Sequence, residues 1–164
     1  MTSLTLTQDN HDQVLALLGP QSWFVACLCA AWCTTCGEYR VRFEELAARF
    51  PDQVFVWIDI EDQADVVGDL DIENFPTLLI QYGDIVSFFG TVLPELQLAE
   101  RLLQAQIEQT PATLLAQANL NEERRQWQRE CNLRQLLGNF RTGLQANPPA
   151  NLAANPAANP AANQ

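Results

Sequence analysis

Residues 23–36 read WFVACLCAAWCTTC, and this stretch decides the fold. Its first seven residues form an unbroken apolar run, which is typical of a strand buried on both faces of a parallel sheet. From about Thr35 to Arg49 apolar positions recur at helical spacing, and Pro51 ends that segment. Cys33 and Cys36 therefore lie where a buried strand passes into a helix, the context in which Cys-x-x-Cys indicates thiol-disulfide chemistry.

The spacing of these two cysteines suits that chemistry. Cys33 falls at the expected helix N-terminus, where free N–H groups and the macrodipole favour a thiolate, and Cys36 follows one turn later. In such a pair one thiolate attacks a substrate disulfide and the other thiol releases the reduced substrate, which leaves Cys33 and Cys36 joined. The sequence therefore predicts Cys33 and Cys36 as the catalytic residues.

The segments on either side alternate between strands and helices. Further short apolar or alternating runs indicate strands, and Tyr82-Gly83-Asp84 indicates a hairpin turn between the last two. The expected strands are residues 3–7, 23–29, 54–60, 75–81 and 85–89, with helices between them, an acidic one over 62–70 and a closing one over about 94–109. This order predicts an α/β fold with a central mixed, mostly parallel sheet flanked by helices and closed by an antiparallel hairpin.

The chain divides into three parts by composition. Residues 1–110 carry the strand and helix alternation, and residues 111–145 predict a helical extension with Trp127 and an apolar stripe. Residues 146–164 repeat Asn, Pro and Ala with little to bury, so the entropy of ordering them is not offset. We expect a domain, a helical extension and a disordered tail.

The net charge and the N-terminal sequence limit the classes of partner and the compartment that we expect. The formal net charge is -11, which disfavours nucleic acid and anionic membrane surfaces, and all nine basic residues are Arg, so no catalytic lysine is available. The first residues resemble no secretory signal, and no apolar run approaches the roughly 18 residues of a membrane span. We therefore expect a cytoplasmic protein without nucleic-acid or membrane partners.

Several local patterns together resemble the thioredoxin family. Residues from about 2 to 109 match its element order, and Trp32-Cys33-x-x-Cys36 matches its active-site motif. Phe75-Pro76-Thr77 resembles its cis-proline loop, and Gly83 and Gly90 fall where thioredoxins carry glycine. The resemblance implies a thioredoxin-like fold, a cis bond before Pro76, and a substrate groove formed by Trp32, Phe75, Pro76 and Thr77.

The resemblance also implies an activity and its partners. It predicts an enzyme that reduces disulfides in protein substrates, with no cofactor or metal beyond a redox-active Cys33–Cys36 disulfide. Electrons would come from a separate donor of the thioredoxin-reductase type, because the chain has no Gly-rich nucleotide fingerprint. Two alternatives stay open: a thioredoxin-like binding or chaperone-type module whose C-terminal helices dock a partner, and a disulfide oxidase or isomerase, which the missing signal sequence disfavours.

Departures from the family pattern affect the expected rate and direction of thiol-disulfide exchange. Thr34-Thr35 replaces the usual Gly-Pro, so the reduction potential and direction of exchange do not carry over. Cys27 stands where the family has a buried Asp that moves the proton of the resolving thiol, and Trp57 stands where its lysine partner is usual. A buried thiol is a poor base at neutral pH, so we expect slow resolution by Cys36.

Three interpretations of Cys27 and Cys29 remain open. The two residues lie two apart on one strand, so their side chains share a face. They are either small buried hydrophobes, or accessory redox residues of which one bridges to Cys36, or part of a four-cysteine zinc or iron–sulfur site with Cys33 and Cys36. Cys131, alone in the extension, is expected to pack, and the eight acids from Asp52 to Glu73 are expected to form a solvated face.

Overall fold

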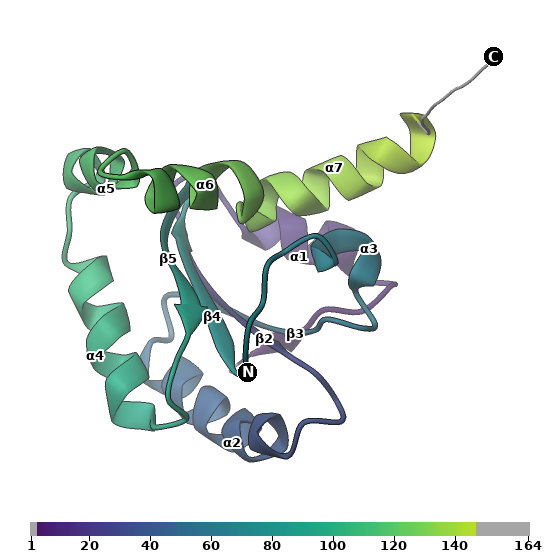
Figure 1. Cartoon of the computed structure of the whole chain (residues 1–164), viewed down its shortest axis with the longest axis horizontal. Coiled ribbons are helices and arrows are strands. Elements are labelled where there is room, and N and C mark those ends of the chain that lie inside the picture. The colour runs from purple at the N-terminus through teal and green to yellow at the C-terminus, as the bar shows by residue number, and fades with distance from the viewer. Residues whose placement is uncertain (1–2, 147–164) are drawn as a thin grey trace.

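The computed structural model describes residues 3–146, with side chains described as far as Phe140. The low-complexity tail predicted to be disordered lies outside the described residues from residue 147 onward. The described part has a five-stranded sheet with helices on both faces, and Figure 1 shows the last three helices lying along one end of this sheet.

The sheet has the order β1-β3-β2-β4-β5. Its parallel pairs are β1 with β3 and β3 with β2, while β4 runs antiparallel to both β2 and β5. The bounds are β1 Leu4–Thr5, β2 Trp23–Cys29, β3 Val54–Asp59, β4 Thr77–Tyr82 and β5 Ile85–Thr91. The predicted mixed sheet is confirmed, with two parallel and two antiparallel strand pairs and with β2, which carries Cys27 and Cys29, at its centre.

Four helices cover the two faces of the sheet. The apolar residues of α1 (His11–Leu17) and α3 (Ala64–Val67) pack on one face, and those of α2 (Thr34–Arg49) and α4 (Leu96–Ile107) pack on the other. The acidic stretch 62–70 was predicted to be helical throughout, but α3 has only four residues. The reason is that Val66 and Val67 are its only apolar residues buried against the sheet, too short a stripe for a longer amphipathic helix.

The extension folds back onto the sheet instead of standing away from it. It consists of α5 (Pro111–Ala118), α6 (Glu122–Glu130) and α7 (Leu133–Ala146), of which α5 and α6 lie beside β5 and α7 lies beside α1 and α3 (Figure 1). Leu133 and Leu137 are each 1% exposed within the apolar cluster on that face. The apolar stripe predicted for this segment is thus used inside the molecule.

Polar contacts of two glutamines, Gln81 and Gln128, join the extension to the hairpin of β4 and β5. The fully buried Gln81 donates from Nε2 to Asn132 Oδ1 at 2.6 Å and accepts from the Leu133 N–H at 3.0 Å. Gln128 accepts from the Val86 N–H and donates to the Val86 carbonyl, both at 2.8 Å, so its amide pairs with the backbone of the edge strand. Such contacts satisfy backbone groups that an uncovered edge strand would leave unpaired.

Among residues 3–146, no helix combines the length and apolar composition that crossing a bilayer requires.

Candidate functional site

The candidate site lies at the carboxyl end of β2, in the middle of the sheet. Three residues connect the end of β2 to Cys33, which caps α2 with an extended backbone, and the Cys33 carbonyl accepts from the Gly37 N–H at 3.2 Å. Because β3 and β4 pair with β2, the segments after β3 and before β4 meet at the same edge. Cys33, at the N-terminus of α2, therefore lies at the edge of the sheet where these segments meet. The macrodipole of a helix favours negative charge at its N-terminus.

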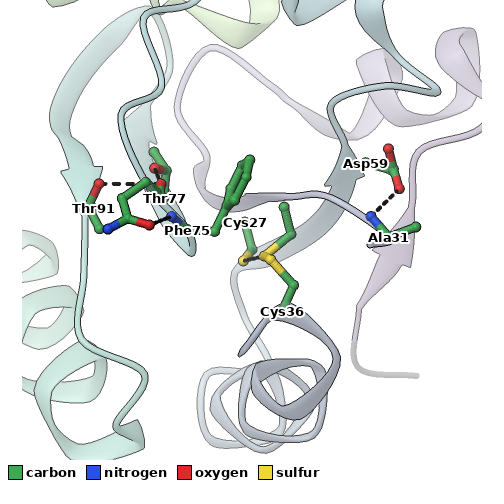
Figure 2. The surroundings of a disulfide bond; sticks show 9 residues. Cys27, Ala31, Cys36, Asp59, Phe75, Thr77 and Thr91 are labelled. Carbon is green, nitrogen blue, oxygen red and sulfur yellow. Dashed lines mark hydrogen bonds between the residues drawn. A yellow bond between two sulfur atoms is a disulfide. The ribbon is translucent and has the colours of Figure 1, made fainter. Parts of the chain in front are cut away.

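Asp59, at the end of β3, holds the loop that leads to Cys33. Its Oδ2 accepts from the Ala31 N–H at 3.0 Å (Figure 2). Its Oδ1 accepts from the N–H groups of Glu61 and Asp62. Glu61 in turn accepts from the Trp32 indole N–H at 3.0 Å. Sequence reasoning missed both acids because it assigned the whole run to a solvated face. Their place at the end of a strand parallel to β2 was the signal that could have found them.

The disulfide in the structure joins Cys29 to Cys36, as in one of the open interpretations of Cys27 and Cys29, whereas the predicted active-site bridge joined Cys33 to Cys36. Cys29 ends β2 and Cys36 lies in the first turn of α2, with their Cα atoms 5.8 Å apart, within the usual range for a disulfide. Both are buried, while Cys33 is a free, partly exposed thiol. The bridge differs because Cys36 faces the sheet beneath it; the catalytic roles of Cys33 and Cys36 remain predictions.

Cys27 lies next to this disulfide but outside it. Its Sγ is 3.9 Å from the Cys29 Sγ, so the two thiol positions share one face of β2 as the alternation of a strand requires. Burial raises the pKa of the Cys27 thiol far above its ordinary value, and the positive charge of Arg40 offsets this only in part. Cys27 therefore stays protonated at neutral pH and does not supply the base that the family's Asp provides.

The residues expected to form the groove come from two segments, the loop that precedes Cys33 and the segment that leads into β4. The Phe75–Pro76 peptide bond is cis, as the resemblance implied, and Phe75 packs against the apolar cluster that holds Cys29 and Cys36 (Figure 2). Trp32 is 66% exposed and its ring meets the Phe75 ring edge-on at 5.6 Å. Thr77 is buried and donates its hydroxyl to the Asn74 carbonyl at 2.7 Å, so its side chain supports the loop from inside.

Two further cysteine interpretations can be placed in the structure. Among the described residues, no group of three or more His, Cys, Asp or Glu side chains is arranged to hold a metal ion. Cys131, at the end of α6, is buried among residues of the α1 and α3 face, away from the other four cysteines. Burial raises its pKa to about 12, with smaller contributions from Glu130 and Asp71.

The fold and the cysteines together define the class of the protein. A sheet of this order, with a cis-proline loop facing cysteines at a strand-to-helix junction, is that of a thioredoxin-fold thiol-disulfide oxidoreductase. The family model for thioredoxin matches residues 2–104. The chain belongs to the thioredoxin family, whose members are protein-disulfide oxidoreductases.

Individual relatives show how far the similarity extends. A thioredoxin H-type of Picea mariana is 34% identical over 91 residues, which cover 54% of this chain and 73% of the relative. The putative thioredoxin 2 of Streptomyces coelicolor is 31% identical over 107 residues, 64% of this chain and 78% of the relative. The match to a putative thioredoxin H10 of Arabidopsis thaliana spans only 40% of that protein, at 30% identity over 43% of this chain.

Solved structures agree in fold. A poplar thioredoxin h superposes with a TM-score of 0.59 over 67% of this chain and all of the relative, at 19% identity. Thioredoxin from Trypanosoma brucei brucei superposes with a TM-score of 0.56 over 66% of this chain and 93% of that one, at 18% identity. At these identities the structures support the fold.

Proposed function

We propose that the protein reduces disulfides in protein substrates, with Cys33 as the nucleophile and Cys36 as the resolving thiol. One observation carries the assignment: Cys33 is the partly exposed cysteine at the N-terminus of α2, and it directly follows the exposed Trp32, whose ring contacts Phe75. Cys27, Cys29 and Cys36 are buried below it. A substrate disulfide approaching this edge therefore meets Cys33 first.

The reaction begins from the form in which Cys33 and Cys36 are both reduced. The Cys33 thiolate attacks one sulfur of the substrate disulfide, forms a mixed disulfide, and releases the other substrate sulfur as a thiolate. The Cys36 thiolate then attacks Cys33 and releases the second substrate thiol. The substrate gains two electrons and two protons, and the protein is left with a Cys33–Cys36 disulfide.

The second step is expected to be slow. In the family the resolving thiol loses its proton to a buried Asp, but here that position holds Cys27, whose pKa is raised by burial. Cys36 is itself 2% exposed, so solvent has little access to its proton. Slow resolution prolongs the life of the mixed disulfide between Cys33 and a substrate.

The proposed partners follow from the same site. The groove formed by Trp32, Phe75 and Pro76 presents apolar surface to an extended substrate segment. A separate reductase of the thioredoxin-reductase type is proposed as the electron donor, so the protein would carry electrons between that donor and its substrates in the cytoplasm. One structural relative is a thioredoxin f2 solved in complex with ferredoxin:thioredoxin reductase, which illustrates such a pairing in that protein.

The alternative of a docking module through the C-terminal helices has less support. Leu133 and Leu137 are buried against the body of the protein, and the Trp127 ring lies 6.1 Å from the Phe88 ring. These apolar residues therefore already pack against the protein itself and are not available to a partner.

Dithiothreitol-driven reduction of insulin tests the proposal, because the assay needs both a reactive thiol and an accessible groove. Wild-type protein should accelerate insulin precipitation, and Cys33→Ser should fall to the rate of dithiothreitol alone. Cys131→Ser is the matched control, since Cys131 is buried on the opposite face of the sheet. Retained activity in Cys33→Ser, or none in the wild type, would overturn the proposal.

A further inference from the structure

The oxidised site in this structure is unusual in which thiol it leaves free. The bridge lies between two buried residues, Cys29 and Cys36, and the partly exposed residue, Cys33, is not part of it. The catalytic cycle described above ends in a different bridge, between Cys33 and Cys36. The two oxidised forms contain the same number of electrons and differ only in the partner of Cys36.

We propose that Cys29 is a third redox-active thiol. It displaces Cys33 from the disulfide with Cys36, so that Cys33 becomes a free thiol again while the protein remains oxidised. This inference rests on the proposed function, since the Cys33–Cys36 bridge is its starting point. It assigns Cys29 a chemical role at the end of β2 beyond that of a small buried side chain.

The positions of the three residues allow the transfer. Cys29 and Cys36 have Cα atoms 5.8 Å apart, and Cys33 packs against the same apolar cluster that contains both. Residues three apart on a helix are neighbours, which brings Cys33 within reach of Cys36. Cys36 thus lies between two partners, one in the strand below it and one at the helix N-terminus.

The transfer is a thiol-disulfide exchange that needs no oxidant or reductant. The Cys29 thiolate attacks the Cys36 sulfur of the Cys33–Cys36 bridge, so that the Cys29–Cys36 bond forms as the Cys33–Cys36 bond breaks. Cys33 leaves as a thiolate, and the proton lost by Cys29 returns to Cys33 or to solvent. Cys33 is partly exposed, so solvent can stabilise its sulfur as it leaves.

The rate and the lifetime of the new bridge follow from burial. Cys29 is 1% exposed, and a thiol in apolar surroundings is rarely a thiolate, so the transfer should be slow compared with turnover. Once formed, the Cys29–Cys36 bridge is screened from external thiols on the α2 face of the sheet. The Cys33–Cys36 form should therefore accumulate first and the Cys29–Cys36 form later.

The transfer changes what Cys33 can do. With Cys36 engaged below, a Cys33 thiolate that attacks a disulfide R–S–S–R forms Cys33–S–S–R and releases one RSH, and no resolving thiol is available to expel the bound group. In the reduced protein the same mixed disulfide is resolved by Cys36. The oxidised protein would thus retain a disulfide-containing partner that the reduced protein releases.

Peptide mapping of the full chain tests the transfer directly. Reduced wild-type protein is oxidised with oxidised glutathione, alkylated with N-ethylmaleimide at increasing times, digested and analysed by mass spectrometry. The Cys33–Cys36 peptide should appear early and the Cys29–Cys36 peptide, with Cys33 not bridged to Cys36, should replace it. A map that contains only the Cys33–Cys36 bridge at all times would overturn the inference.

A second measurement counts the freed thiol with Ellman's disulfide reagent. The protein is first oxidised with excess trans-4,5-dihydroxy-1,2-dithiane, which leaves no mixed disulfide on it. When Ellman's reagent is added to the native wild type, about one equivalent of thionitrobenzoate should be released rapidly, and the second thionitrobenzoate of the reagent should remain bound to Cys33. Cys29→Ala should release none rapidly, because Cys33 then stays bridged to Cys36. Cys27→Ala, from the same face of β2, is the matched control and should behave as the wild type. Equal release from wild type and Cys29→Ala would contradict the transfer.

Insulin reduction separates this inference from the function on which it rests. An active wild type with an inactive Cys33→Ser, together with only the Cys33–Cys36 bridge in the map, refutes the transfer and leaves the proposed function standing. An inactive wild type refutes the proposed function whichever bridge is found.

Discussion

The two faces of the sheet both bury cysteine, but they surround it differently. On the α2 and α4 face, Cys27, Cys29 and Cys36 come together where a strand ends and a helix begins. On the α1 and α3 face, Cys131 packs among apolar residues that include Leu133 and Leu137. The same residue type is thus disulfide-bonded or merely space-filling according to whether the fold brings a second thiol within bonding distance.

The faces also differ in how their covering segments are held. α7 covers its face through a buried apolar stripe and the polar contacts of Gln81 and Asn132. The loop that leads to Cys33 is held by two carboxylates: Asp59 accepts from the Ala31 N–H, and Glu61 accepts from the Trp32 indole N–H. Substitutions on the first face should therefore change stability, and those at the loop should change activity.

The largest effect is expected at Leu137. Leu137→Ala leaves a cavity between α7 and the sheet, and removing a fully buried leucine side chain lowers the free energy of unfolding by about 2–5 kcal/mol. Leu115→Ala, at a residue 57% exposed, is the matched control and should change it by less than about 0.5 kcal/mol. Urea unfolding followed by tryptophan fluorescence measures both.

Insulin reduction by the same two variants sharpens the contrast. At a temperature where Leu137→Ala remains folded, its rate should equal that of the wild type, because Leu137 lies on the face opposite the disulfide. A folded Leu137→Ala protein with lowered activity would show that the two faces are coupled.

A smaller effect is expected at Asp59. Asp59→Ala removes the acceptor of the Ala31 N–H and frees the loop that positions Cys33. Asp59 also accepts from the N–H groups of Glu61 and Asp62. Loss of even one charge-assisted contact of this kind corresponds to about 1.5 kcal/mol, so kcat/KM for insulin reduction should fall by roughly tenfold or more. Asp62→Ala removes a neighbouring negative charge without removing the Ala31 contact and should keep most of the activity. Equal losses in the two variants would assign the effect to charge instead of position.

The smallest effect at neutral pH is expected at Cys131, whose contribution to stability changes with pH only above about pH 9. Its pKa is about 12 in the folded protein and near 9 in an exposed thiol, so above pH 9 the unfolded chain loses this proton and the folded protein keeps it. The contribution is complete below pH 9 and is lost as the pH rises toward 12, by at most about 1.4 kcal/mol per pH unit for one thiol. Urea unfolding of Cys131→Ala should show a flatter decline over this range, and identical slopes would contradict the assignment.

Local pattern was sufficient for the elements that bury long apolar runs. β2 and α2 were predicted almost to the residue, because an unbroken apolar run and a 3.6-residue period are properties of the segment itself. The same reasoning overestimated α3, since its acidic residues are compatible with a helix but only two valines pack against the sheet. The length of α3 depends on how much apolar surface of the sheet is available for the helix to cover.

Contacts between distant segments were outside the reach of such patterns. Asp59 could not be recognised as the anchor of the Ala31 loop from a run of eight acids, because 28 residues separate the two partners. Trp127 and the apolar stripe of the extension were visible in the sequence, but their destination was not. Whether an apolar stripe packs against its own domain or against a partner depends on the shape of the folded domain. The sequence of the stripe alone does not specify that shape.

By itself, the sequence determined the class of the protein: the order of strands and helices, Cys33 and Cys36 at a strand-to-helix junction, and the proline loop that faces them. Only the tertiary structure decided which thiol Cys36 bonds and where the C-terminal helices lie. The physical reason is that periodicity reports how each segment buries its own side chains, whereas a disulfide or a helix contact depends on distances between segments that only the packed fold sets.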